Sequence, residues 1–145
     1  MKYQITDKFS RIGLHDSHFS NISFDKDSIA INIDWGFLEN FEEEKIREAI
    51  VFDEAELYFS GIKSQTFKKI TNDNSIQIDF PNSLCEDNWL IMTNECIDNI
   101  NEFSMVITMT NYEQYIEWII NFESGQLTWD KFILHKNWLN GQEKL

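Results

Sequence analysis

Short stretches of the chain alternate apolar and polar residues, the pattern of a strand that has one face in a core. The clearest stretch, residues 29–35, has Ile or Trp at every odd-numbered position. Residues 18–24 fit a preceding strand, and the turn-forming residues 25–28 separate the two. The pattern predicts a β-hairpin over residues 18–35.

A second alternating stretch lies near the C-terminus. Residues 116–122 have Ile, Trp, Ile and Phe at the even-numbered positions. Residues 123–126 are typical of a turn, and Leu127 and Trp129 resume the alternation. We therefore expect a second hairpin here.

Three further strands are predicted between these hairpins, at residues 50–59, 76–80 and 105–110. Polar, turn-rich breaks such as residues 71–75 separate them. The spacing predicts a mainly β (α+β) fold, with an antiparallel sheet folded as a sandwich or open barrel and one or two short helices. Nothing indicates a linker or repeat, so residues 1–145 are expected to form a single domain.

Two segments fit more than one structure. In residues 83–101, Ser83 and Glu86 fit a helix-capping box. A set of residues would then share one helical face: Cys85, Trp89, Met92, Cys96 and Ile100. A short strand over residues 89–92 is the competing interpretation. Residues 40–49 fit either a helix or an acidic loop.

The chain has 25 Asp and Glu residues against 12 Lys and Arg, a formal net charge of -13. Since 42% of the residues are hydrophobic and 14% aromatic, the chain can form a core, and the charge is expected on its surface. An acidic surface repels phosphate backbones and anionic lipids, so nucleic acid and membranes are not expected partners. A basic protein is the natural complement, although net charge also simply maintains solubility.

The N-terminal residues 1–8 lack the apolar segment of a secretion signal, and no apolar stretch approaches the roughly 20 residues of a membrane span. A cytoplasmic location is expected. Cys85 and Cys96 form no CxxC pair, which argues against a zinc site or a disulfide framework. Both are expected to be buried free thiols.

No catalytic motif stands out. The five glycines are too scattered for a phosphate-binding loop, so no cofactor is expected. His15, Asp16 and His18 could bind a metal or relay a proton, but His135 is the only other histidine. In the favoured interpretation, Asp16 and Ser17 bond nearby backbone and His15 orients the start of the strand. Neither metal ligands nor catalytic residues are predicted, and the protein is not expected to be an enzyme.

Acidic and aromatic residues are interleaved between positions 35 and 44. An aromatic anchor within an acidic rim is the composition of a protein-binding hot spot. Such a run also occurs as a solvated face, and its aromatic residues fit a core equally well. The hypothesis of a partner-binding surface names Trp35, Phe37, Glu39, Phe41, Glu42, Glu43 and Glu44.

Residues 14–22 read Leu-His-Asp-Ser-His-Phe-Ser-Asn-Ile, and residues 27–33 read Asp-Ser-Ile-Ala-Ile-Asn-Ile. This opening resembles the H-D-S start and first hairpin of small bacterial β-rich proteins, several of which are thought to be immunity proteins of polymorphic toxin systems. The resemblance covers the first quarter of the chain. It implies an inhibitor or scaffold protein rather than an enzyme.

Charge and resemblance together predict an immunity or inhibitor protein that binds a cognate, basic toxin and masks its active site. Two alternatives stay open at this point. One is a β domain whose interior holds a small apolar ligand. The other is a metal-dependent hydrolase that uses His15, Asp16 and His18.

Overall fold

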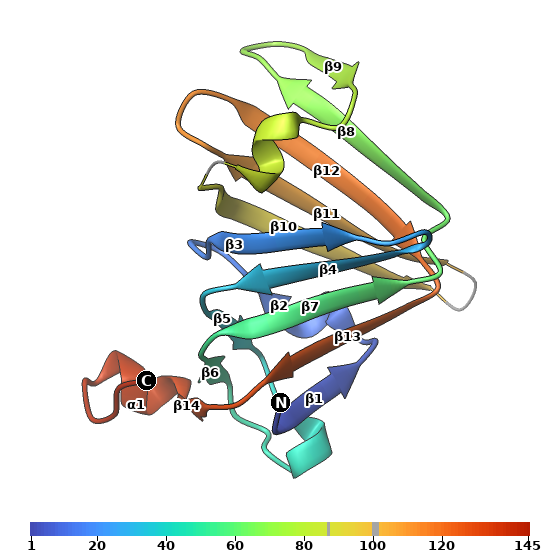
Figure 1. Ribbon diagram of the computed structural model, residues 1–145. Helices are drawn as coiled ribbons and strands as arrows, with labels where there is room; N and C mark the ends of the chain where they lie inside the picture. The colour runs from blue at the N-terminus through green and yellow to red at the C-terminus, as the bar shows by residue number, and fades with distance from the viewer. Residues whose placement is uncertain (87, 100–101) are drawn as a thin grey trace.

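Three antiparallel sheets form the structure, a computed structural model that describes residues 1–86, 88–99 and 102–145 (Figure 1). Sheets 1 and 2 have five strands each, and sheet 3 has four. Their inner faces share one apolar core. The predicted fold class, a β-rich sandwich with short helices, is confirmed.

Sheet 1 contains, in spatial order, β1 (Tyr3–Thr6), β13 (Ser124–Trp129), β7 (Ala55–Ser60), β4 (Ser28–Ile33) and β3 (Phe19–Phe24). β3 and β4 are the predicted first hairpin. Alternate residues face the core, as in the buried row of Ile31, Leu57 and Leu127 across three strands. Trp35, expected to continue the second strand of the hairpin, lies two residues beyond the end of β4.

Sheet 2 contains, in spatial order, β10 (Leu90–Asn99), β11 (Glu102–Thr110), β12 (Tyr115–Phe122), β8 (Ser64–Ile70) and β9 (Ser75–Ile78). The strands predicted at residues 76–80, 105–110 and 116–122 correspond to β9, β11 and β12. β8 was not predicted. Phe67 is its one buried residue, so the strand carries no apolar alternation that the sequence could reveal.

Sheet 3 contains β14 (Phe132–Leu134), β6 (Ile50–Phe52), β5 (Gly36–Leu38) and β2 (Ile12–Gly13). The strand predicted over residues 50–59 is thus two strands in two sheets, β6 and β7. The helices are short: η1 (Phe9–Arg11), η2 (Glu42–Glu44), η3 (Asn82–Cys85) and α1 (His135–Leu139). α1 packs against β14 and β6. Among the described residues, no helix has the length and apolar character needed to cross a membrane.

The predicted second hairpin is wrong, because β12 and β13 belong to different sheets. β12 pairs with β11 and β8, whereas β13 pairs with β1 and β7. The chain crosses between the sheets at Glu123, whose N–H bonds to the carbonyls of Ser60 and Gly61. Gly125 follows, where a Cβ would overlap the Phe9 ring. Alternation predicted both strands but could not say which neighbours they pair with.

The helix predicted over residues 83–101 is also wrong. A 3-10 turn at Asn82–Cys85 is followed by the long strand β10, so the competing strand interpretation was nearer. Pairing with β11 along the strand outweighs the helical spacing of the apolar residues. Ile100 lies outside the described residues. Residues 40–49 form a tight loop, with the short η2 enclosed by a bridge between Phe41 and Ile46, rather than a helix.

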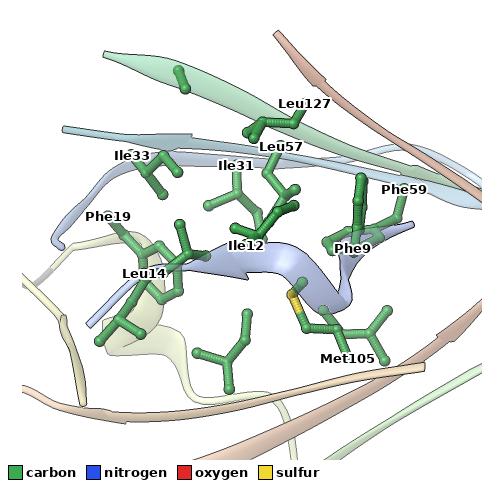
Figure 2. Close-up of a cluster of buried hydrophobic side chains, with 14 of the residues drawn as sticks. Phe9, Ile12, Leu14, Phe19, Ile31, Ile33, Leu57, Phe59, Met105 and Leu127 are labelled. Atoms are coloured by element: carbon green, nitrogen blue, oxygen red, sulfur yellow. The ribbon is translucent and has the colours of Figure 1, made fainter. Parts of the chain in front are cut away.

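Large side chains fill the space between the sheets. Figure 2 shows Phe9 and Ile12, from the segment between β1 and β3, lying between Leu57 and Leu127 of sheet 1 and Met105 of sheet 2. The largest fully buried side chains come from all three sheets and their connections: Trp89, Trp118, Trp129, Phe9, Phe41, Phe52, Phe59 and Phe122. Protein side chains therefore occupy the interior in which the alternative hypothesis placed an apolar ligand.

Candidate functional site

The predicted acidic run forms an exposed turn between β5 and β6. Glu42, Glu43 and Glu44 make up the single turn of η2, and all three are exposed. Lys45 ends the turn in the left-handed conformation, with φ of 59°. Its N–H bonds to the carbonyl of Glu42 at 2.9 Å. The turn therefore directs several carboxylates to the surface, as the hypothesis required.

A buried arginine holds the middle carboxylate of this turn. The Arg11 side chain is only 7% exposed and donates from Nη1 and Nη2 to the two Glu43 oxygens, at 2.9 and 2.5 Å. Arg11 also donates to the backbone carbonyls of Lys8 and Asn40. The hydrogen bonds from Arg11 lower the pKa of Glu43 below its ordinary value of 4.5. Glu43 is thus committed to an internal ion pair.

Further cations surround the same turn. Lys8 Nζ lies 3.8 Å from Glu42, and Lys136 Nζ lies 2.8 Å from Glu48. Lys45 and Arg47 line a half-open hollow of about 530 Å³ together with Asn40 and Glu42. We call residues 39–48 with these cations the paired turn. Its five carboxylates lie among five cations, three of which form ion pairs, so its local charge is close to balanced.

The structure separates the aromatic residues that the hypothesis grouped. Phe41 is 1% exposed and packs against Trp129 and Phe132, with ring centroids 5.0 and 5.7 Å away. As a core residue it is not a surface anchor, and this part of the prediction is wrong. Phe37 is half-buried, edge-on to the His135 ring of α1 at 5.0 Å.

Trp35 lies at the surface, half-buried. Its ring is 5.9 Å from the ring of Trp138 on α1, at an interplanar angle of 30°. Its Nε1 donates to the carbonyl of Asp16 at 3.3 Å, and its own carbonyl accepts from the Ser17 hydroxyl at 2.5 Å. Trp35 is therefore held at the surface by its contacts with α1 and with the Asp16 backbone.

A second acidic region, which the sequence analysis missed, lies around Trp35. It combines Asp34 after β4, the turn between β6 and β7, and Asp130 after β13, and we call it the acidic end: Asp34, Asp53, Glu54, Glu56 and Asp130. Figure 1 shows the end of β4, the start of β7 and the end of β13 on the same side of the molecule as α1. Because Gly36 pairs with Phe52 in antiparallel strands, the backbones of Trp35 and Asp53 lie next to each other just beyond the paired ends of β5 and β6.

Two hollows connect these carboxylates. One, of about 270 Å³, is lined by Asp34, Glu54 and Glu56 together with Asn32 and Met1, which carries a basic amino group. The other, of about 230 Å³, is lined by Asp53, Glu54 and Asp130 and by one cation, Lys131. Within the described part of the chain, Asp53, Glu54 and Glu56 make no ion pair. Asp34 lies 3.4 Å from His18 and Asp130 accepts from the Lys2 N–H, so the uncompensated charge of this region is carried by Asp53, Glu54 and Glu56.

The residues of the acidic end come together only because strands that are distant in the sequence pair with one another. Its residues lie in three segments up to about 100 positions apart, so no short acidic run marks the site. The sequence signal was limited to Asp53, Glu54 and Glu56, which looked like part of a strand. Placing them beside Asp34 and Asp130 required the register of β7 with both β4 and β13.

His15, Asp16 and His18 form no joint site. His15 Nε2 lies 3.6 Å from Asp16, whereas His18 Nδ1 lies 3.4 Å from Asp34. In residues 1–86, 88–99 and 102–145, no group of three or more His, Cys, Asp or Glu is arranged to hold a metal. As favoured from the sequence, Ser17 bonds backbone, and the turn from residue 14 to 17 docks on β10 through Asp16 N–H to the Ile91 carbonyl.

The two cysteines are free thiols, as predicted, but only one is shielded. Cys85 is exposed, so its expected burial is wrong. Cys96 is half-buried on β10, and burial together with the nearby Asp98 raises its pKa to about 12. Cys96 is therefore a poor nucleophile.

Comparison with known proteins leaves the site to be interpreted from its own geometry. No family model matches this chain, and no match is found among curated proteins or solved structures. These results do not test the resemblance of residues 14–22 to immunity proteins, which stays a prediction.

Proposed function

We propose that the protein is an inhibitor of the immunity type, which binds a basic toxin domain and masks its active site in the cytoplasm. The observation that carries this proposal is the acidic end: carboxylates from three segments, of which Asp53, Glu54 and Glu56 make no described ion pair, next to the backbone of Trp35. Occlusion of an active site needs no chemistry from the inhibitor. It needs a surface of matching shape and charge.

Free carboxylates favour the acidic end over the paired turn as the docking surface. A carboxylate that already has an ion-pair partner must lose or share that partner when it binds a new cation. Glu43 would have to leave the buried Arg11, which is costly because a charge would stay unpaired. Asp53, Glu54 and Glu56 have no such contact to give up, so a partner's Lys or Arg gains their full attraction.

Trp35 supplies the apolar part of the same surface. Aromatic residues, Trp above all, dominate the energetics of protein interfaces when acidic or polar residues surround them. Contacts with Trp138 and with the Asp16 carbonyl hold the Trp35 ring in place before a partner arrives. A pre-ordered ring reduces the entropy that binding would otherwise cost.

The chemistry of the acidic end favours a partner that handles nucleic acid. An enzyme that binds a phosphate backbone presents clustered Lys and Arg in its active site. Carboxylates on a protein surface match the same positive potential and speed the encounter at low salt. We therefore propose a basic nuclease domain as the class of toxin.

The first experiment is affinity capture with the tagged protein from a lysate of its source organism, at low and then moderate salt. We expect one basic protein to be retained in stoichiometric amount and released as salt rises. Mass spectrometry identifies it, and purified inhibitor added to it must abolish its activity. A bait that retains nothing at either salt, or a partner whose activity continues in the complex, contradicts the proposal.

Matched charge reversals then locate the surface. We expect Glu54→Lys with Glu56→Lys to weaken the complex by about 100-fold, since like charges would face each other. Glu42→Lys with Glu44→Lys is the control in the paired turn and should cost about 10-fold or less. A larger loss of affinity in the control would indicate that the partner binds at the paired turn, as the sequence analysis predicted.

The contribution of Trp35 is measured separately. Trp35→Ala should weaken the complex by about 10- to 100-fold, as for a central aromatic anchor. Phe37→Ala removes a ring from the same strand region but one that lies against His135. An equal effect of both variants would indicate damage to the packing of α1 rather than loss of a contact with the partner.

A further inference from the structure

The turn between β11 and β12 contains a residue in a strained backbone conformation. Tyr112 has a φ of 74°, in the left-handed region that favours glycine. The other described non-glycine residues with positive φ are aspartates or lysines at smaller angles: Asp7, Lys8, Asp16 and Lys45. Aspartate tolerates this region because its side chain bonds nearby backbone, whereas a bulky aromatic residue is an outlier there.

The type of turn also favours glycine at this position. The N–H of Asn111 donates to the carbonyl of Gln114, so Tyr112 and Glu113 form a two-residue loop between the strands. Of these two residues, only Tyr112 has a positive φ. This is the pattern of a type II′ turn, whose first central residue is usually glycine. A glycine at position 112 would therefore relieve strain.

Two neighbouring side chains hold Tyr112 in this conformation. The hydroxyl of Thr110, a buried residue, accepts the N–H of Tyr112 at 2.9 Å and donates to the carbonyl of Gln114 at 2.8 Å. Asn111 Oδ1 accepts the N–H groups of Glu113 and Gln114 at 3.1 and 2.8 Å. These four hydrogen bonds fix the direction in which the Tyr112 side chain leaves the turn.

The Tyr112 ring contributes little to the fold itself. Its side chain is 73% exposed, the highest value among the large hydrophobic residues that the structure describes. Within the same part of the chain, the ring stacks on no other aromatic ring and the hydroxyl makes no hydrogen bond. Strained residues that the surrounding structure holds in place are typical of binding sites. Tyr112 is therefore better explained by an external contact than by packing.

The Tyr112 turn lies on the side of the molecule that carries the acidic end. Figure 1 shows the connection from β11 to β12 on the same side as the end of β4. Neighbouring backbone positions join the two: Thr110 pairs with Leu90, Leu90 bridges to His18, and the His18 carbonyl accepts the N–H of Asp34. Three steps of about 5 Å span at most about 15 Å. A standard interface of about 800 Å² on each partner is about 30 Å wide, so one bound protein reaches both regions.

We infer that Tyr112 is a second anchor for the basic partner of the acidic end, and that its ring receives a Lys or Arg of that partner. The face of an aromatic ring attracts a cation, and a tyrosine at an interface adds apolar contact area. Glu113, exposed and without a described ion pair, lies next to it and adds negative charge. The fixed direction of the side chain lowers the entropy cost of binding. This inference rests on the proposed function.

Stability and binding should change in opposite directions when the strain is removed. Tyr112→Gly should raise Tm by about 2 to 4 °C, because relief of strain exceeds the added freedom of the unfolded chain. The same variant should bind about 10-fold more weakly to the basic protein captured by the wild type and then purified, measured by isothermal titration calorimetry. A fall in Tm would show that Tyr112 supports the fold, and overturns the inference.

Two control variants separate the ring from the backbone. Tyr112→Phe keeps an aromatic face and should bind within about 2-fold of the wild type. Lys45→Gly relieves a positive φ of 59° in the paired turn and should raise Tm without weakening the complex. A Phe variant as weak as Tyr112→Gly, or an equal loss of affinity in Lys45→Gly, overturns the assigned role of the ring.

The same titrations distinguish failure of this inference from failure of the proposed function. A wild-type protein that captures no basic partner contradicts the proposed function, and the inference with it. A partner that binds the wild type and Tyr112→Gly equally well, but is lost with Glu54→Lys and Glu56→Lys, overturns the inference alone. Retention of the partner by the wild type, together with the expected loss in Tyr112→Gly, supports both.

Discussion

The paired turn and the acidic end contain equal numbers of carboxylates but differ in what surrounds them. In the turn, Arg11, Lys8 and Lys136 lie within 4.0 Å of acidic side chains. At the acidic end, Glu54 lines one hollow with Asp34 and Met1 and a second hollow with Asp53, Asp130 and Lys131, and Asp53, Glu54 and Glu56 make no described ion pair. The densest acidic run in the sequence is therefore the region whose charge is more nearly neutralised.

This difference shows that the density of acidic residues along the sequence is a poor guide to the electrostatic potential of the surface. Nearby opposite charges cancel part of the electrostatic potential of a charged side chain, and only the remaining potential attracts a partner. Arg11 and Lys8 lie about 30 residues before the turn and are brought to it by η1 and by the pairing of β2 with β5. Four predictions test whether the two regions differ as described.

The largest effect is expected from removal of the buried cation of the turn. Arg11→Ala leaves Glu43 and the carbonyls of Lys8 and Asn40 without their donor. We expect a loss of about 2 to 3 kcal/mol in the free energy of unfolding, measured with urea. Lys8→Ala removes an exposed pair as the control and should cost under about 0.5 kcal/mol. Equal effects would mean that burial does not distinguish the two pairs.

The second effect is the pH dependence of the same ion pair. Glu43→Gln should lower the free energy of unfolding at pH 7 by about 1 kcal/mol, allowing for the solvent around Glu43. Folding lowers the pKa of Glu43, so its contribution is complete above its ordinary value of 4.5 and is lost as the pH falls through the folded pKa. The difference between wild type and variant should therefore shrink on acidification below pH 4.5.

The adjacent variant Glu44→Gln is the control for that measurement. Glu44 lies in the same turn without a described ion pair, so the change should be under about 0.5 kcal/mol at pH 7. A gap between wild type and Glu43→Gln that stays constant from pH 7 to acid would contradict the role of the Arg11 contact.

The third effect concerns the aromatic part of the acidic end. Trp138→Ala removes the ring that lies 5.9 Å from both Trp35 and His135. We expect a loss of about 1 kcal/mol in the free energy of unfolding and a red shift of tryptophan emission as Trp35 becomes more exposed. Leu139→Ala, at a residue 64% exposed, should change neither quantity. A Trp138→Ala protein with unchanged stability would show that α1 does not hold Trp35.

The smallest effect distinguishes free from paired carboxylates directly. Glu54→Gln with Glu56→Gln should stabilise the protein by about 0.3 kcal/mol at low salt, because it relieves repulsion at the acidic end. The gain should vanish at high salt. Glu42→Gln with Glu43→Gln, in the paired turn, should destabilise instead. Destabilisation by both pairs would mean that the acidic end also has internal partners.

The sequence predicted individual strands better than their neighbours. The hairpin of β3 and β4 was correct because its apolar positions and its turn agree over adjacent residues. The apparent hairpin of β12 and β13 had equally good alternation, yet the chain changes sheets at Glu123. The apolar residues of β10 also fit helical spacing, which predicts a helix, but pairing with β11 makes the segment a strand.

The candidate site was predictable only in part for the same reason. The acidic composition and the exposure of Glu42 and Glu44 followed from the residues themselves, whereas the surface position of Trp35 did not. The burial of Phe41 could not be foreseen, because an aromatic residue in an acidic run fits a core or a surface equally well. Its neighbours Trp129 and Phe132 lie about ninety positions later in the chain.

By itself, the sequence determined that this protein is acidic, β-rich and furnished with aromatic residues for a large core. Those properties depend on composition and on the period of two along each strand, which are local. The tertiary structure alone decided which carboxylates have an ion-pair partner and which aromatic residues stay at the surface. Each of these depends on residues brought together across strands, and a Coulomb or packing interaction depends on distance in space, whatever the separation along the chain.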